Sequence, residues 1–129
     1  MKQTKNSKQR TAVLERLCST TSHPTALELY EMVRSEMPNI SLATVYRNLN
    51  LLCEEGRAIK LTADGADHFD GTVEPHYHFM CNGCKRVYDV EMEHDAQLDQ
   101  VAQNATGGEI TGHSLMFYGQ CRHCLEQKN

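Results

Sequence analysis

The chain has 129 residues, enough for one ordinary domain or two small ones, and its formal net charge is −4. Its apolar runs are too short for a membrane span and its polar start does not resemble a signal peptide, so we expect a cytoplasmic protein. Residues 1–60 carry nine Lys and Arg against six Asp and Glu, whereas residues 61–129 carry four against eleven. The net charge alone argues against nucleic-acid binding, but the asymmetry suggests a basic binding half and an acidic, metal-binding half.

Residues up to about 40 predict two helices. Ser7 is the expected N-cap of the first helix, and a basic cluster surrounds it, which fits a binding surface or a solvated terminus equally well. The cluster comprises Lys2, Lys5, Lys8 and Arg10. Thr25 and Glu28 form a capping box for a second helix, which is expected to run to about Glu36 because Pro38 then stops it.

A third helix is expected from Leu42 to about Glu55, capped by Ser41 and closed by Gly56. Its apolar stripe comprises Val45, Leu49, Leu52 and Cys53. Its opposite face carries Ala43, Thr44, Arg47, Asn48 and Asn50, with Tyr46 at the flank. Such small and polar groups suit phosphates and base edges, so the pattern fits a helix-turn-helix and an ordinary amphipathic helix about equally.

A β-hairpin is predicted next, with strands at 57–61 and 66–70 joined by a tight turn at Asp64-Gly65. Three helices followed by a hairpin describe a winged helix. Residues 71–75 are expected to form a hinge between two domains.

The remaining residues predict a small α+β unit. Strands are expected at His76–Met80 and at 86–90, a helix from about Asp95 to Ala105, and a strand from Ile110 to Tyr118. An exposed edge of this sheet would invite pairing with a second copy of the chain.

Two C-x-x-C pairs dominate the chemistry of this second half. Cys81 and Cys84 form the first pair, and Cys121 and Cys124 form the second. Four thiolates in two such pairs suit a closed tetrahedral zinc site. Two disulfides are disfavoured in a reducing compartment, and a redox pair is expected to open a helix in a βαβ unit, which is not visible here.

His76 and His78 lie two positions apart in a predicted strand, so both imidazoles face the same side of the sheet. Because four cysteines already complete a zinc site, these histidines indicate a second site of different chemistry, although a coincidental surface pair remains an alternative on this pattern alone.

Four segments together resemble the ferric-uptake-regulator (Fur) family of metal-dependent bacterial repressors. They are His23–Ala26, Ser41–Leu49, His76–Cys84 and Gly112–Gly119, and the resemblance covers nearly the whole chain in the correct order. It implies an α+β protein with an N-terminal winged helix-turn-helix domain at 1–70, a hinge at 71–75 and a small C-terminal α/β dimerisation domain at 76–129. A homodimer that binds an AT-rich inverted repeat in double-stranded DNA is then expected, and not an enzyme.

The resemblance also implies site residues. Structural zinc would be bound by Cys81, Cys84, Cys121 and Cys124. A regulatory Fe(II) or Mn(II) would be bound by His23, Asp70, His76, His78 and Asp89. DNA contacts would come from Lys5, Thr44, Tyr46 and Arg47.

Within the family, Asp at positions 70 and 89 resembles the peroxide-sensing branch, whereas iron-sensing members usually carry Glu at the first of these. Five ligands leave an octahedral ion one open position for hydrogen peroxide, and the resemblance implies oxidation of His23 or His76. Tyr77 between the two histidines puts a third metal site in doubt and leaves Glu93, His94 and His113 unassigned. The alternatives are an iron-responsive repressor, a small non-haem iron enzyme and a zinc-ribbon interaction module.

Overall fold

The computed structural model describes residues 4–63 and 65–127, which form two compact units that divide between Val73 and Glu74. This division falls inside the segment 71–75 for which a hinge is expected. The first unit contains a two-stranded sheet and the second a three-stranded sheet, so the chain has the predicted α+β content. In the described ranges, no helix is both long enough and apolar enough to cross a membrane.

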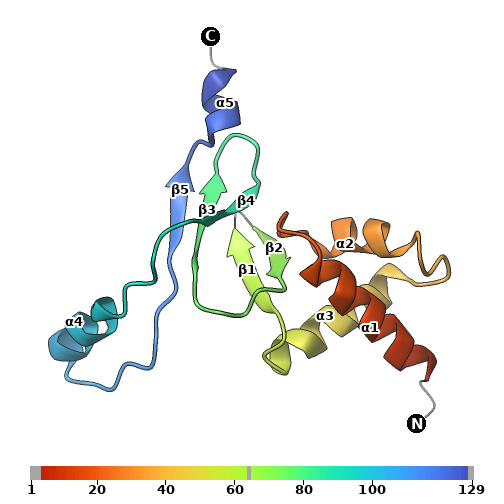
Figure 1. Ribbon diagram of the computed structural model, residues 1–129, viewed down its shortest axis with the longest axis horizontal. Coiled ribbons are helices and arrows are strands. Elements are labelled where there is room, and N and C mark those ends of the chain that lie inside the picture. Colours follow the sequence, from red (N-terminus) through yellow and green to blue (C-terminus); the bar gives the residue numbers. More distant parts are fainter. Residues whose placement is uncertain (1–3, 64, 128–129) are drawn as a thin grey trace. The chain divides into compact units, whose positions relative to one another are not determined.

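Three helices build the first unit: α1 (Lys5–Cys18), α2 (Ala26–Val33) and α3 (Leu42–Glu54) (Figure 1). The predicted N-cap of α1 is wrong. Thr4 caps this helix, because its hydroxyl oxygen accepts the backbone N–H of Ser7 at 3.0 Å, and Ser7 lies in the first turn.

The start of α2 agrees with the sequence, and its end comes earlier. The capping box is confirmed, since Thr25 Oγ1 accepts the N–H of Glu28 and Glu28 Oε1 accepts the N–H of Thr25. Helix α2 ends at Val33, and residues 34–36 form a turn.

A β-hairpin completes the first unit. Strands β1 (Ile59–Ala63) and β2 (Ala66–Asp70) pair antiparallel, with Ile59 opposite Asp70 and Ala63 opposite Ala66. Strand β1 begins two residues later than predicted. Asp64 of the predicted turn lies outside the described residues, and Gly65 beside it has a φ of +77°, which favours glycine.

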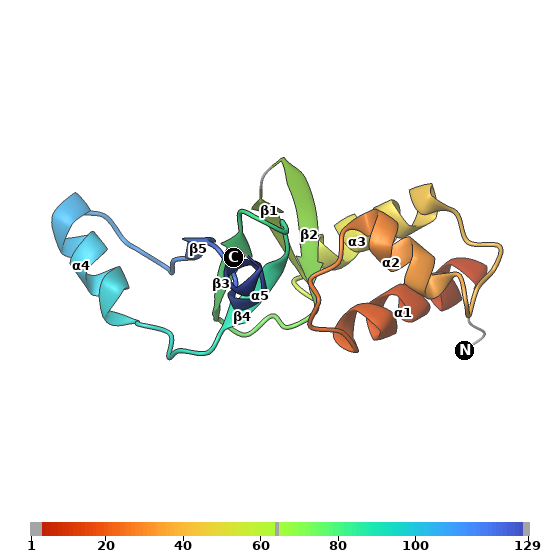
Figure 2. The same ribbon diagram turned by 90° about the horizontal axis from the view of Figure 1, so that it is seen from above.

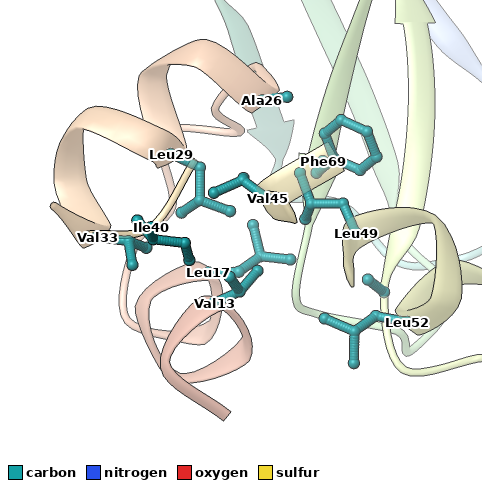
Figure 3. Packing of buried hydrophobic residues seen from close by; sticks show 11 residues of the cluster. Val13, Leu17, Ala26, Leu29, Val33, Ile40, Val45, Leu49, Leu52 and Phe69 are labelled. Atoms are coloured by element: carbon teal, nitrogen blue, oxygen red, sulfur yellow. The ribbon is translucent and has the colours of Figure 1, made fainter. Parts of the chain in front are cut away.

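The core of this unit joins all three helices to the hairpin through Phe69 (Figure 3). Phe69 lies on β2 with none of its side chain exposed, packed among aliphatic residues of the helices. The cluster comprises Val13, Leu17, Ala26, Leu29, Val33, Ile40, Val45, Leu49, Leu52, Ala58 and Phe69. Burial of this shared apolar surface holds α3 and the wing in one body.

The second unit is a sheet in the order β4-β3-β5. Strand β3 (Tyr77–Cys81) pairs antiparallel with β4 (Val87–Val90) and parallel with β5 (Met116–Gly119). The predicted strand from Ile110 is too long, because β5 begins at Met116, and Leu115 before it contributes only its carbonyl, which accepts the N–H of His78 at 3.3 Å. A short helix that the sequence did not indicate, α5 (Arg122–Glu126), follows.

Helix α4 (Gln97–Thr106) lies between β4 and β5 in the chain and is joined to the sheet by extended segments at both ends (Figure 2). It ends at Gly107, whose φ of +71° makes a left-handed cap. Although the structure describes every residue of this helix, none is buried. Val101 is 63% exposed, so none of the described residues of this unit covers the apolar side of α4 there.

Candidate metal centres and DNA-reading helix

The four predicted zinc ligands come together at one end of β3. Cys81 ends this strand, and Cys84 lies in the turn after it. Cys121 is the N-cap of α5, and Cys124 lies within that helix. The sulfur of Cys81 is 3.6 Å from that of Cys124, and the sulfur of Cys84 is 3.9 Å from that of Cys121. All four sulfurs lie within 4.8 Å of one another.

These separations fit zinc. A tetrahedron with Zn–S bonds of about 2.3 Å has sulfurs about 3.8 Å apart, which lies between the two measured separations. Backbone N–H groups point at the sulfurs, since Cys81 Sγ accepts the N–H of Cys84 at 3.4 Å and that of Cys121 at 3.3 Å. Such N–H groups neutralise part of the charge of a thiolate, so the cluster is built to hold the anionic form of its ligands.

The metal-free thiols do not lose their protons together. The N–H groups of Cys84 and Cys121 lower the pKa of the Cys81 thiol to about 6. Hydrogen bonds to Cys81 and Cys121 raise the pKa of the Cys124 thiol to about 12. Hydrogen bonds to the sulfurs of Cys121 and Cys84 likewise raise the pKa of the Tyr88 hydroxyl. A divalent cation would supply the positive charge that allows all four cysteines to be thiolates at once.

In the first unit, His23 and Asp70 form a buried pair. His23 Nε2 lies 3.3 Å from Asp70 Oδ2, and both side chains are almost completely buried. The other carboxylate oxygen, Oδ1, accepts the N–H of Thr72 at 2.8 Å, which fixes the orientation of the carboxylate. Imidazole and carboxylate donors held this closely suit a divalent metal ion.

In the second unit, His76, His78 and Asp89 form a second group of donors. Strand pairing sets His78 opposite Asp89, and His78 Nε2 is 3.6 Å from Asp89 Oδ1. His76 Nε2 is 3.1 Å from the same oxygen, and the two imidazole centroids are 4.3 Å apart. His76 Nδ1–H donates to the carbonyl of Glu74 at 2.6 Å, which leaves Nε2 as the coordinating nitrogen.

The chemistry of both groups differs from that of the cysteine cluster. Nitrogen and oxygen donors suit Fe(II), Mn(II) and similar divalent ions, whereas thiolates suit zinc. Neighbouring ligand atoms about 3 Å apart are expected around an octahedral ion with bonds of about 2.1 Å, close to the 3.1 and 3.3 Å pairs. The residues present therefore fit a hard or borderline divalent ion.

His113, unassigned from the sequence, belongs to a hydrogen-bond network on the far side of β3 from His78. Its Nε2 accepts the hydroxyl of Tyr77 at 2.8 Å, and its Nδ1–H donates to Asp99 of α4 at 2.8 Å. The Tyr77 oxygen in turn accepts the N–H of Asp95, and the ring of His94 stacks on His113. Both nitrogens of His113 are thus engaged, which leaves neither available as a metal ligand in this geometry.

Helix α3 presents two of the predicted DNA contacts at the surface. Tyr46 and Arg47 are exposed, whereas Thr44 is half buried and its hydroxyl accepts a hydrogen bond from that of Ser41. The predicted polar face is wrong at Asn48, which is 3% exposed because its side chain lies beside the buried stripe. Lys5 is exposed in the first turn of α1. The DNA contacts themselves remain predictions.

Sequence reasoning missed His68, which lies on β2, two residues before Asp70 of the first donor pair. Its imidazole is buried, and its Nδ1–H donates to the backbone carbonyl of His23 at 2.8 Å. The signal was present in the alternation His68-Phe69-Asp70 of β2, because residues two apart in a strand share a face.

Known proteins resemble this chain over most of its length. The model of the ferric uptake regulator family matches residues 1–118. The peroxide-responsive repressor PerR of Staphylococcus epidermidis is 37% identical over 122 residues, covering 94% of this chain and 81% of that protein. The peroxide operon regulator of Bacillus subtilis is 36% identical over 122 residues, covering 94% and 84%.

Solved structures agree with these relatives. The peroxide stress regulator of Campylobacter jejuni has a TM-score of 0.81 and 32% identity, covering 93% of this chain and 91% of that one. The ferric uptake regulator of Helicobacter pylori has a TM-score of 0.79 and 25% identity, covering 97% and 85%. The chain belongs to the ferric uptake regulator family.

Proposed function

We propose that this protein is a metal-dependent, DNA-binding transcriptional repressor that senses hydrogen peroxide through a regulatory Fe(II) or Mn(II) ion. The observation that carries the proposal is the pair of pre-built nitrogen and oxygen donor groups, His23 with Asp70 and His76 with His78 and Asp89. Relatives at 35–37% identity are named as peroxide-responsive regulators, which supports the peroxide signal.

The two donor groups would jointly bind one ion. Two donors in the first unit and three in the second are each too few for an ion that prefers six ligands, whereas five together leave one position open. The domain limits that follow are a DNA-binding domain at 1–70, a hinge at 71–75 and a dimerisation and metal-binding domain at 76–129. An ion bound by both domains would favour one conformer of the dimer and so control its DNA affinity.

Peroxide sensing depends on the open position. A bound Fe(II) ion would supply one-electron cleavage of hydrogen peroxide, and the histidines that hold the ion would be the nearest oxidisable groups. His23 is buried and His76 is partly buried, so both are shielded from oxidants in bulk solvent. Oxidation would therefore be confined to a ligating histidine, and loss of that ligand would release the DNA.

The cysteine cluster would hold a structural zinc ion, and its role would be to staple β3 to the C-terminal segment. Cys81 ends β3 and Cys84 lies in the turn after it, whereas Cys121 caps α5, 37 residues further along the chain from Cys84, and Cys124 lies within that helix. Closing such a long loop through a metal makes zinc binding part of the folding free energy.

A homodimer would cover the apolar surface that the second unit leaves exposed. The exposed apolar side chains of this unit include Val101 on α4 and, on opposite faces of the edge strand β5, Phe117 and Tyr118. Two copies related by a two-fold axis would present two α3 helices to an inverted repeat in double-stranded DNA, which is expected to be AT-rich. The protein would act in the cytoplasm. Arg47 and Tyr46 would reach bases and phosphate, Lys5 would contact the minor groove, and Thr44 would add a further DNA contact.

The decisive experiment measures operator binding of the Mn(II)-loaded and the Fe(II)-loaded protein before and after hydrogen peroxide. Both forms should bind DNA before treatment, and only the Fe(II) form should release it afterwards, with one added oxygen on His23 or His76 by mass spectrometry. The Mn(II) form is the control, because Mn(II) cleaves peroxide poorly in this way. Oxygen found only on methionines, together with surviving operator binding, would instead identify an iron-responsive repressor of iron-uptake genes.

A further inference from the structure

His23 has an unusual backbone for a residue that is not glycine. Its φ is +52°, in the left-handed region that L-residues other than Asn, Asp and occasionally His rarely enter. Its side chain is buried, with 2% of the residue exposed. Surrounding contacts must hold a strained residue in such a conformation, and strain of this kind is often found at functional sites.

Strand β2 supplies these contacts from three consecutive residues. His68 Nδ1–H donates to the carbonyl of His23 at 2.8 Å, and the N–H of Phe69 donates to the carbonyl of Pro24 at 2.9 Å. Asp70, on the same face of the strand as His68, lies 3.3 Å from the imidazole of His23. One strand therefore fixes both the backbone and the side chain of His23.

We infer that His68 is a positioning residue for the regulatory metal, holding the His23 backbone in the conformation that directs its Nε2 toward Asp70. This inference rests on the proposed function, in which His23 and Asp70 are ligands. The Phe69 contact uses a backbone N–H, and the Asp70 contact uses a proposed ligand. Of the three contacts, only that of the His68 imidazole depends on a side chain that is not itself a proposed ligand.

The contact needs a hydrogen-bond donor at the position of Nδ1. A buried carbonyl that loses its donor is left without compensation for its lost hydration, and the local backbone then relaxes. Relaxation at φ +52° moves the chain toward common conformations and turns the His23 imidazole away from Asp70. Groups that orient a metal ligand in this way typically change metal affinity 10- to 100-fold when they are removed.

The test compares three substitutions of His68 in the full-length, zinc-loaded protein. Asn places its amide N–H close to the position of Nδ1, Leu fills similar space with no donor, and Gln moves the donor one methylene further out. Mn(II) is the probe, and the electron paramagnetic resonance of free Mn(II) reports the affinity without DNA. We expect His68→Leu to weaken Mn(II) binding about 10- to 100-fold, and His68→Asn to stay within about threefold of the wild type.

Peroxide treatment of the Fe(II)-loaded proteins gives a second readout that a general loss of stability would not produce. Trypsin separates His23 in residues 17–34 from His76 in residues 61–85, because cleavage follows Arg16, Arg34, Lys60 and Lys85. With His23 displaced, the share of added oxygen on His23 should fall in His68→Leu relative to His76, and His68→Asn should restore it.

Equal Mn(II) affinity in wild type and His68→Leu, or equal losses in the Leu and Asn variants, would overturn the inference. If His68→Leu loses its zinc and fails to fold, the Mn(II) affinities of His68→Asn and His68→Gln are compared in its place. The Gln variant is expected to bind Mn(II) more weakly. The proposed function would be refuted if the wild type did not bind Mn(II), or if replacing His23 left its Mn(II) affinity unchanged. If instead the wild type binds Mn(II) normally and the His68 variants bind it equally well, only the inference about His68 is refuted.

Discussion

A methyl group added at Gly83 would reach into the cysteine cluster. A Cβ built on Gly83 lies 3.0 Å from the sulfur of Cys124 and 3.3 Å from its Cβ, and 3.6 Å from the sulfur of Cys81. The first two contacts are closer than ordinary van der Waals distances, so Cys124 must move by a few tenths of an ångström. Gly83→Ala should therefore displace one zinc ligand while every ligand remains present.

Overpacking of this kind costs about 1–3 kcal/mol. Because about 1.4 kcal/mol corresponds to a factor of ten in an equilibrium constant, zinc affinity should fall about 5- to 150-fold. A competition titration with a zinc chelator measures this change directly. Cys81→Ser, which removes a ligand outright, provides the lower reference and should lose zinc altogether.

Gly112→Ala is the matched control, because a Cβ at Gly112 meets no described atom within 4 Å and the same change is made in the same unit. Its zinc affinity should equal that of the wild type. If Gly83→Ala also binds zinc as the wild type does, then Cys124 adapts freely, and the geometric account of a tightly packed zinc turn is wrong.

Three further substitutions test other parts of the molecule. Arg47→Ala should cost about 1–3 kcal/mol of operator affinity without changing metal content, and unaltered footprinting would show that α3 is not the reader. Asp89→Glu keeps the charge but changes the coordination geometry, so metal-activated DNA binding should persist while peroxide inactivation of the Fe(II) form is lost; continued release of DNA would contradict this. Phe69→Ala should lower the free energy of unfolding by about 3–5 kcal/mol in urea denaturation, whereas Leu27→Ala, at a residue 52% exposed on α2 of the same unit, should cost much less; equal losses would refute the role of Phe69 in the core.

Features encoded by neighbouring residues were predictable from the sequence. The capping box of Thr25 and Glu28, the caps of α3 and the C-x-x-C turns all depend on residues a few positions apart, so local spacing was sufficient. Even here, Thr4 and Ser7 are both good caps, and only the hydrogen bond between Thr4 Oγ1 and the Ser7 N–H shows which of them begins α1.

Features that need a distant partner were less predictable. Residues 110–114 were predicted to continue the strand, but the backbone pairing with β3 begins at the Leu115 carbonyl and continues through β5. Asn48 borders an apolar stripe, and its burial depends on how closely the other helices pack there. The alternation in β2 places His68 on the same face as Asp70, but the partner of its imidazole, the His23 carbonyl, lies 45 residues away and is not given by any local pattern. His23 and Asp70 were paired only through the family resemblance.

Because helix α4 is exposed, its stability should depend on the protein concentration. Ten residues are too few for a stable isolated helix in water, and its own unit buries none of them. In the proposed homodimer, docking against a second copy would supply the missing stabilisation, and this contribution would follow mass action. Amide hydrogen exchange across residues 97–106 should slow as protein concentration rises, and dilution should expose this segment to proteases first. In a cell that makes little of this repressor, the protein would therefore be degraded faster.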